Sequence, residues 1–338
     1  MKRLLIAISL LTATLFAQPA PAPGLSVAAS PANGPSYSQM YCSGFITSEK
    51  LPRTNFVLGS KESPHEDRFP GRSQLFLGGP ALKRGETYSI VRQVEDPNRE
   101  DSSPEQRRKL ARIGALYQEI GWVTVRAVEN GVAVASFDFA CDTATRGDLI
   151  IAFREKPPVA FRRVDAPINS FLPNLQAVRG HILGSRDFVG LLGTGQIVYT
   201  DFGSAKGAKP GDYLLVFRGY SEGDLNKIDR ASERLPKGQE DTAVRPAKVR
   251  PDAEAAAPHR VLGELLVLDV TSASSTAVIT RAISEMELGD AVQSEEASAA
   301  TATGAAPETC RPASRLRRML FPGHGCQSPK PAHAEDKP

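Results

Sequence analysis

A tandem repeat constrains the fold of this chain more than any other feature of its sequence. The segment Ile120–Val128, followed by Arg146-Gly147-Asp148, returns as Leu262–Val270, followed by Leu288-Gly289-Asp290. The two copies align without a gap at a constant offset of 142 positions. The shared residues are apolar or turn-forming types, so the repeat predicts a duplicated scaffold and not a catalytic site. The identical pairs include Gly121/Gly263, Val125/Val267, Val128/Val270, Ala135/Ala277, Ala140/Ala282, Gly147/Gly289 and Asp148/Asp290.

Three further blocks extend the repeat upstream in the same order. In one of them a glycine and an acid begin a run that ends in arginine, at Gly85–Arg92 and at Gly211–Arg218. The loops between the blocks differ in length, while the order of the blocks is kept, which indicates an ancient duplication. The matched blocks are Ser43–Ile46 with Arg179–Ile182, Ser73–Leu77 with Gly195–Tyr199, and Lys83–Arg92 with Lys209–Arg218.

Each copy has the pattern of β-structure. Apolar and polar residues alternate with a period of two around Val123 and Val125. Asn130-Gly131 predicts a tight hairpin, because both residues accept the positive φ angles of a primed turn. We therefore predict an all-β chain of two tandem, internally duplicated small β-barrel or sandwich domains, with disordered termini and polar insertions. The structural turns, in which the aspartates act as caps, are expected at Gly147-Asp148, Gly211-Asp212 and Gly289-Asp290.

Changes in composition mark the domain boundaries. Stretches rich in Pro, Ala and Ser predict disorder, and prolines between the two copies predict an extended connector. Both copies carry a polar insertion after the strand that ends in arginine, and Pro104 marks the start of a short helix in the first one. The predicted segments are a signal peptide (1–17), a disordered linker (18–40), β domain 1 (41–153), a connector (154–177), β domain 2 (178–292, with a disordered insertion at about 221–258) and a disordered tail (293–338).

The first residues have the pattern of a secretory signal peptide. Lys2 and Arg3 precede the apolar run Leu4–Phe16, which is too short to span a bilayer as a permanent helix. We therefore expect a periplasmic or secreted protein without a transmembrane segment after signal cleavage. The net charge of +3, with Lys and Arg spread among acids, does not predict binding to nucleic acid.

The four cysteines of an exported chain are expected to form disulfides, with three pairings open. The repeat favours Cys42–Cys141, because it places the two cysteines on the first and last strands of the unit, where the other copy has apolar residues. Such a bridge closes a loop of about a hundred residues and contributes on the order of 4 kcal/mol to stability. Two free buried thiols are the alternative. The aligned positions are Cys42/Val178 and Cys141/Ile283, and the tail offers a second candidate pair, Cys310 and Cys326.

Short blocks of the second copy carry a resemblance to a known class of protein. These blocks are Gly195–Tyr199, Gly203–Gly207, Lys209–Arg218, Gly263–Val267, and Ser275–Ile279 closing on Leu288-Gly289-Asp290. In this order and spacing, the second copy resembles the β-rich C-terminal region that follows LysM modules in many bacterial envelope proteins, and the C-terminal domain of flagellar assembly protein T. The resemblance implies a small barrel-like β domain in a non-catalytic envelope protein. We find no LysM module, the glycan-recognising part of those proteins, so glycan binding is not implied.

Three residues are candidate contacts for a partner. Arg92 and Arg218 are repeated charges at the end of the same strand. They are interpreted as rim arginines paired with acids or, alternatively, as contacts to an anionic envelope polymer. Trp122 aligns with Glu264, and a position that accepts both is expected to face solvent, where tryptophan can contact a protein or a sugar ring. No metal or cofactor is predicted, since His65-Glu66-Asp67 lacks a second histidine at ligand spacing.

These features favour a non-catalytic binding or scaffolding protein of the cell envelope, associated with peptidoglycan or with an envelope protein. Two alternatives are a component of secretion or flagellar assembly, and an exported hydrolase. The hydrolase would need a polar cluster that breaks the symmetry of the repeat, and the sequence shows no such cluster. The sequence does not predict the oligomeric state.

Overall fold

The computed structural model describes residues 33–62, 65–97, 104–162, 168, 171–172, 179–219 and 258–295. The predicted signal peptide, most of the predicted linker, the second insertion up to residue 257 and the tail beyond residue 295 lie outside the described residues. The candidate pair Cys310–Cys326 lies outside them as well.

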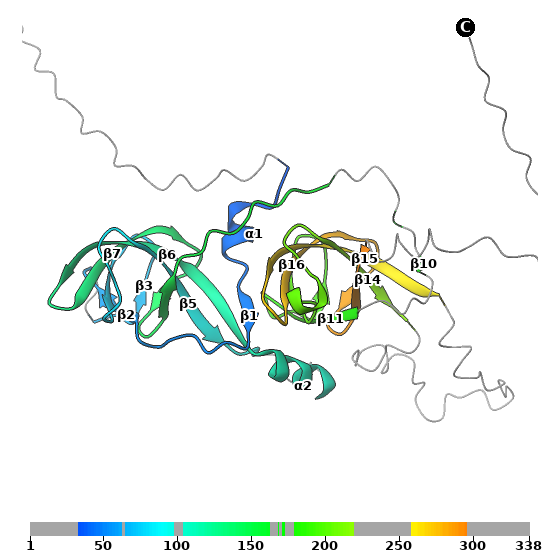
Figure 1. Ribbon diagram of the computed structural model, residues 1–338, viewed down its shortest axis with the longest axis horizontal. Coiled ribbons are helices and arrows are strands. Elements are labelled where there is room, and N and C mark those ends of the chain that lie inside the picture. The colour runs from blue at the N-terminus through cyan, green and yellow to red at the C-terminus, as the bar shows by residue number, and fades with distance from the viewer. Residues whose placement is uncertain are drawn as a thin grey trace, which may run out of the picture.

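The first copy folds into a closed β-barrel of six strands, which we call barrel 1 (Figure 1). The strands follow one another in the order β6-β5-β9-β2-β4-β7, and β7 pairs with β6 to close the ring. A further strand, β1, adds to the first part of β6, and β3 pairs with β8 in a separate ribbon. The strands are β1 (Phe45–Thr47), β2 (Phe56–Ser60), β3 (Arg68–Phe69), β4 (Gln74–Gly78), β5 (Thr87–Val94), β6 (Ala115–Glu129), β7 (Val132–Ala140), β8 (Ala144–Thr145) and β9 (Leu149–Ala152).

The second copy repeats this topology strand for strand as barrel 2. Its closed ring has the order β15-β14-β18-β11-β13-β16, with β16 paired to β15. The short strand β10 adds to β15 as β1 adds to β6, and β12 pairs with β17. The elements are β10 (Phe171–Leu172), β11 (Arg179–Ser185), β12 (Leu191–Leu192), β13 (Ile197–Thr200), the 3₁₀-helix η2 (Ser204–Lys206), β14 (Tyr213–Arg218), β15 (His259–Val270), β16 (Ser275–Ala282), β17 (Met286–Glu287) and β18 (Ala291–Ser294).

Each barrel encloses its own apolar core, and the two cores match position by position. The alternating residues of the strands point into the barrel, as the period of two predicts. The prediction of an all-β chain with two similar small barrel or sandwich domains is therefore confirmed, and both domains are closed barrels. The equivalent core pairs are Val57/Ile182, Phe69/Leu192, Leu75/Val198, Ile90/Val216, Val123/Leu265, Val125/Val267, Ala135/Ala277 and Ile150/Val292.

The long strands β6 and β15 each contain one of the repeated glycines at a position where no side chain fits. Gly121 has φ 147° and Gly263 has φ 156°. A Cβ on Gly121 would lie 2.3 Å from the carbonyl oxygen of Phe139, and a Cβ on Gly263 would lie 2.1 Å from that of Arg281. Both distances are far below van der Waals contact, so the geometry of the closed barrel accounts for glycine in both copies.

The turns expected from the sequence are present. Gly147, Gly211 and Gly289 have φ angles of 88°, 93° and 104°, which L side chains rarely adopt. Asn130-Gly131, with φ angles of 51° and 80°, joins β6 to β7. The carboxylate of Asp212 accepts a hydrogen bond at 2.8 Å from the backbone N–H three positions earlier in its turn.

One upstream match between the copies is wrong. β11 takes the place of β2 in its barrel and not of β1. Val57 of β2 and Ile182 of β11 each donate a backbone hydrogen bond of 2.9 Å to the aspartate of the repeated Gly-Asp turn. The match of Ser43–Ile46 with Arg179–Ile182 therefore does not hold. Four residues, of which only a glycine and an isoleucine are shared, carry too little information to distinguish two apolar strands.

A second match slips by one residue. Leu75 of β4 lies opposite Ala135, and Val198 of β13 lies opposite the equivalent Ala277. Leu75 therefore corresponds to Val198, whereas aligning Ser73–Leu77 with Gly195–Tyr199 places it opposite Ile197. A one-residue slip moves every side chain of a strand to its other face, so only the barrel closure fixes this register.

Cys42 and Cys141 form the predicted disulfide, with their Cα atoms 5.5 Å apart and a sequence separation of 99. Cys42 follows the helix α1 (Tyr37–Tyr41), which lies at the end of the segment predicted to be a disordered linker. The alignment of Cys42 that favoured the pair is wrong, however, because Cys42 ends α1 and does not lie on the strand that corresponds to β11. Ile283, the equivalent of Cys141, is 41% exposed and not a core residue. The bridge attaches an added helix to barrel 1 and has no counterpart in the repeat.

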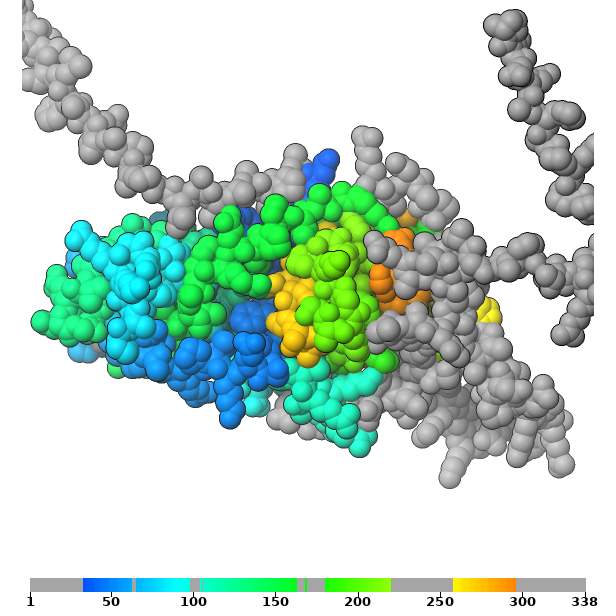
Figure 2. All heavy atoms as spheres, viewed as in Figure 1, coloured from blue at the N-terminus to red at the C-terminus, as the bar shows by residue number. Residues whose placement is uncertain are grey.

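The helix α1 and the strand β1 lie between the two barrels (Figures 1 and 2). Side chains of α1 join an apolar cluster with residues from the outer faces of both barrels. A second helix, α2 (Pro104–Ile113), begins at the predicted Pro104 and extends from barrel 1 to β11 of barrel 2. Among the described residues, no helix has the length and apolar character needed to cross a membrane.

Candidate functional site

Each of the two repeated arginines pairs with an aspartate of its own barrel. Arg92 holds Asp148 with two hydrogen bonds of 2.8 Å, and Arg218 holds Asp290 with bonds of 2.7 and 2.9 Å. Such two-point pairs are among the stronger hydrogen bonds in proteins. The bonds to Asp148 raise the pKa of the Arg92 guanidinium despite its partial burial. Both arginines therefore join the end of a strand to the Gly-Asp turn.

The two aspartates also cap their turns. Asp148 accepts a hydrogen bond of 2.7 Å from the backbone N–H of Thr145, and Asp290 accepts one of 2.7 Å from that of Glu287. Burial raises the pKa of Asp290, although Arg218 acts in the opposite direction. The repeated Arg and Asp thus form one structural unit in each barrel, in agreement with the interpretation of the aspartates as turn caps.

The expectation that Trp122 faces solvent is wrong. Its side chain is only 6% exposed and stacks on Phe139 with a ring-centroid distance of 4.7 Å. Tyr37 and Tyr41 of α1 cover its other side at 5.4 and 5.1 Å. Its counterpart Glu264 is also buried, at 1% exposure. Tryptophan and glutamate occupy the same position because different segments cover it in the two barrels.

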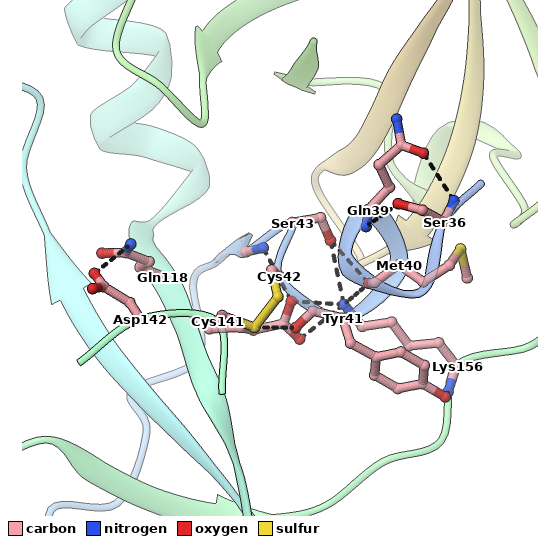
Figure 3. Close-up of a disulfide and its surroundings, with 12 residues drawn as sticks. Ser36, Gln39, Met40, Tyr41, Cys42, Ser43, Gln118, Cys141, Asp142 and Lys156 are labelled. Atoms are coloured by element: carbon pink, nitrogen blue, oxygen red, sulfur yellow. Dashed lines mark hydrogen bonds and ion pairs between the residues drawn. A yellow bond between two sulfur atoms is a disulfide. The ribbon is translucent and has the colours of Figure 1, made fainter. Parts of the chain in front are cut away.

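A buried group of charged side chains lies where the barrels meet, and we call it the interbarrel charge cluster. Lys156 of the connector places its Nζ 2.8 Å from Glu119 and 3.8 Å from Asp269, so that it lies between an acid of each barrel. It also donates a hydrogen bond of 2.8 Å to the carbonyl of Met40 (Figure 3). Arg154 binds both oxygens of Asp269 at 2.7 and 2.6 Å.

This cluster is balanced in charge and, except for the 64% exposed side chain of Arg154, is largely excluded from water. The side chains of Lys156 and Asp269 are each 3% exposed. Burial raises the pKa of Glu119, while Lys156 and the backbone N–H of Gly44 lower it. Removing one partner from such a group is costly, because the other charges stay buried. The sequence offered one sign of it, the single acid Asp269 near the end of the apolar run Leu265–Val270.

A cleft of about 260 Å³ opens beside this interface. Its inner wall is apolar, and its rim carries polar side chains from the end of β5 and from α2. Phe188, which lines the cleft, has φ 55°, an uncommon conformation for a residue with a large side chain. The apolar wall includes Ile46, Leu110, Leu116 and Leu183, and the rim includes Gln93, Glu95, Asp96 and Arg107.

The helix α2 ties the two sides of the cleft together. Gln106 of this helix is 2% exposed and donates a hydrogen bond of 2.8 Å to the carbonyl of Leu183 in barrel 2. The Nζ of Lys109 lies 2.9 Å from Nδ1 of His181 on the same strand of barrel 2. The cleft is therefore built by both barrels at once, and its shape depends on how they are held together. Ligand sites commonly lie at such domain interfaces.

No protein-family model and no curated protein sequence matches this chain. Within the residues that the structure describes, no group of three or more His, Cys, Asp or Glu side chains is arranged to hold a metal ion. The cleft has apolar surface for a ligand to bury and polar groups to orient it. Of the three predicted contact residues, the structure places Arg92 and Arg218 at the turns and Trp122 under α1, and none of them lines the cleft.

Proposed function

We propose that this chain is an exported, non-catalytic binding and scaffolding protein of the cell envelope, and that it binds peptidoglycan or an envelope protein at the interbarrel cleft. The observation that carries this proposal is the cleft itself, which has walls from two barrels fastened to each other. A rigid concave surface with an apolar wall and a polar rim suits the binding of an extended ligand.

Two other features support the proposal. The Cys42–Cys141 disulfide is consistent with export, because such bridges persist in oxidising compartments. The residues that the duplication preserved form turns, cores and turn-capping ion pairs, as expected of a scaffold. Small β-barrels with side-chain-filled interiors bind partners on their outer surfaces or between domains.

The test is co-sedimentation of the mature chain, Gln18 to Pro338, with isolated peptidoglycan sacculi. We expect part of the protein to pellet and to stay in the pellet at moderate salt. Ala111→Glu places a charge at an exposed position on the cleft wall and is expected to lower the pelleted fraction. Val128→Glu, at a residue 44% exposed and outside the cleft, is the matched control and is expected to pellet like the wild type.

Each outcome decides a separate part of the proposal. Wild-type protein that stays wholly in the supernatant would exclude direct wall binding, and crosslinking in cells would then test for an envelope protein partner. Equal pelleting of both variants and the wild type would show that the cleft is not the binding surface.

A further inference from the structure

The interbarrel cleft has the size and lining of a pocket for the side chains of an extended peptide. Its volume of about 260 Å³ lies just below the range of about 300–1,000 Å³ that is common for small-molecule sites. Consecutive residues of two segments line it, Gln93–Asp96 at the end of β5 and Leu183–Ser185 of β11. The apolar wall can therefore bury one or two large side chains, while the rest of the ligand lies along the rim.

One residue of the wall is held in a backbone conformation that costs free energy. Phe188 has φ 55°, in the left-handed region that residues with large side chains rarely adopt. The hydroxyl of Ser185, a residue 3% exposed, donates to the carbonyl of Val189 and accepts from its N–H, both at 2.9 Å. These bonds fix the turn that contains Phe188. Strained residues of this kind gather at binding sites, and Phe188 lines the cleft and lies outside the apolar core of barrel 2.

The charged side chains of the cleft favour a ligand with positive charge next to its apolar groups. Of the described side chains that line the cleft, Glu95 and Asp96 are acids and Arg107 is a base. Arg108 and Arg112, two further exposed bases of α2, are not among the lining residues. A ligand that combines large apolar side chains with cations therefore complements both the wall and the rim.

The tail of this chain contains one segment with that chemistry. From residue 296 to residue 338, every Leu, Met and Phe lies within Leu316-Arg317-Arg318-Met319-Leu320-Phe321, which we call the tail segment. Four arginines occur within positions 311–318, and no acid occurs between Glu308 and Glu335. The tail segment therefore offers large apolar side chains and cations together.

The tail segment is close enough along the chain to reach the cleft. The last described residue, Glu295, follows β18, in which Gln293 lies opposite Arg179 of β11. The cleft residue Leu183 is four positions further along β11, or about 13 Å at about 3.3 Å per residue. The 20 residues between Glu295 and Leu316 span up to about 70 Å when extended. A short tether gives an effective concentration on the order of 1 mM, so a weak contact is enough to fill the cleft.

We propose that the tail segment docks in the interbarrel cleft of its own chain and competes there with the external ligand. Its large apolar side chains lie against the apolar wall beside Phe188, and its two arginines pair with Glu95 and Asp96 on the rim. An external ligand has to displace the segment before it can bind. Only this competition rests on the proposed function, because the docking itself needs no partner.

The experiment uses a cysteine that precedes the tail segment by six positions. In the mature chain, Cys326→Ser leaves Cys310 as the only thiol, because Cys42 and Cys141 are bridged. A nitroxide spin label on Cys310 broadens the NMR signals of backbone amides that it approaches. The chain is deuterated and labelled with nitrogen-15, and the same sample after reduction of the nitroxide with ascorbate gives the reference intensities.

The two regions to compare are the cleft and the far end of β6. We expect the amides of Leu110, Leu183 and Phe188 in the cleft to lose most of their intensity. The amide of Val128, which lies outside the cleft, is expected to keep its intensity. Full intensity at the cleft would overturn the proposal. Broadening that appears when a spin-labelled chain is mixed with a separate nitrogen-15 chain would assign the segment to a second copy and also overturn it.

Variants of the segment and of the cleft decide whether the contact is specific. Ala111→Arg places a cation on the cleft wall and is expected to abolish the broadening, whereas the matched control Val128→Arg is expected to keep it. A variant that retains the arginines of the segment but loses its large apolar side chains is expected to abolish the broadening as well. Broadening that survives in it would contradict docking against the apolar wall. Its substitutions are Leu316→Ser, Met319→Ser, Leu320→Ser and Phe321→Ser.

Sedimentation with sacculi separates a failure of this inference from a failure of the proposed function. We expect the serine variant of the tail segment to pellet more than the wild type, because its cleft is open. Equal pelleting of the two chains would overturn the competition. Broadening without any pelleting would leave the docking in place and exclude direct wall binding, whereas pelleting without broadening would exclude the tail segment as the occupant of the cleft.

Discussion

The two barrels agree in their interiors and differ in what covers their outer surfaces. The outward-facing position on the long strand holds Trp122 in barrel 1 and Glu264 in barrel 2, and both are buried. Aromatic residues of α1 cover Trp122, whereas Arg162 of the connector pairs with Glu264. The duplication thus preserved the interior, which one barrel fills alone, while the exterior depends on the segment that packs on it.

The largest loss of stability is expected for Lys156→Met, which removes the cation that the two barrels share. Glu119 and Asp269 would lose this partner while remaining in the interface. Breaking a buried ion pair in this way costs about 3–5 kcal/mol. Urea unfolding followed by circular dichroism measures the loss, and Lys156→Arg, which keeps the charge, is expected to lose much less. A loss of about 1 kcal/mol or less, typical of an exposed pair, would contradict burial of the cluster.

A smaller but clear difference in the loss of stability is expected between substitutions at the two covered positions. Trp122→Ala leaves a cavity under α1, and replacing a buried tryptophan in this way costs about 3 kcal/mol or more. Glu264→Gln keeps the acceptor for the hydroxyl of Thr280, 3.0 Å away, so its cost is about 1–2 kcal/mol. Thermal unfolding of both variants tests this order. Equal losses would mean that the aromatic cover on barrel 1 adds no stability.

The repeated turns allow a third comparison, in which the two barrels share the residues but differ in electrostatics. Asp148→Asn replaces one carboxylate oxygen by an amide NH2 group, which would face the groups that now donate hydrogen bonds to the carboxylate. We expect this change to lower the free energy of unfolding by about 2 kcal/mol. Burial and the neighbouring acid Glu287, which has Thr145 as its counterpart in barrel 1, oppose the charge of Asp290 and raise its pKa, so Asp290→Asn is expected to cost less. Unfolding curves of the two variants at neutral pH measure the difference. A larger loss for Asp290→Asn would show that Arg218 outweighs the burial of that carboxylate.

The smallest expected effect is on the pH dependence of stability, and it involves Asp201 of barrel 2. Burial raises the pKa of Asp201, but His181 and Lys206 lower it more, so the net shift is below the ordinary value of 3.8. Because the folded state favours the ionised form, Asp201 stabilises the protein above this value and loses its contribution as the pH falls through the folded pKa.

Asp201→Asn should therefore reduce the stability lost between about pH 6 and about pH 3. Chemical unfolding at both pH values measures this change, and Asp187→Asn, an exposed neighbour on the same barrel, serves as the control. An unchanged pH dependence in Asp201→Asn would contradict the lowered pKa.

Much of the fold could be predicted from the sequence because it depends on local patterns. The period of two around Val123 and Val125 predicted strands, and Asn130-Gly131 predicted the hairpin between β6 and β7. Pro104 predicted the start of α2. Two of the three upstream matches failed because short apolar blocks resemble one another whichever strand they form, and only strand pairing distinguishes β1 from β2. The third, Lys83–Arg92 with Lys209–Arg218, holds.

Neither the interbarrel cleft nor the interbarrel charge cluster could be predicted, since the residues of each come from distant parts of the chain. Lys156 lies in a proline-rich connector, and its partners Glu119 and Asp269 belong to different barrels. Trp122 was expected to face solvent because no sequence pattern indicated that α1 packs on it. A pattern within one strand shows which residues share a face, but not what lies opposite that face.

The sequence by itself determined two similar small β domains, their turns and a short list of possible disulfide pairs. These features follow from periodicity, from glycines that no other residue replaces and from the small number of cysteines. Only the tertiary structure decided that both domains are closed barrels and that Cys42 pairs with Cys141. It also decided that segment 36–47 lies between the barrels and that the repeated arginines pair with the aspartates of the Gly-Asp turns. The physical reason is that burial on an outer surface is set by a second segment, whose position depends on the packing of the whole chain.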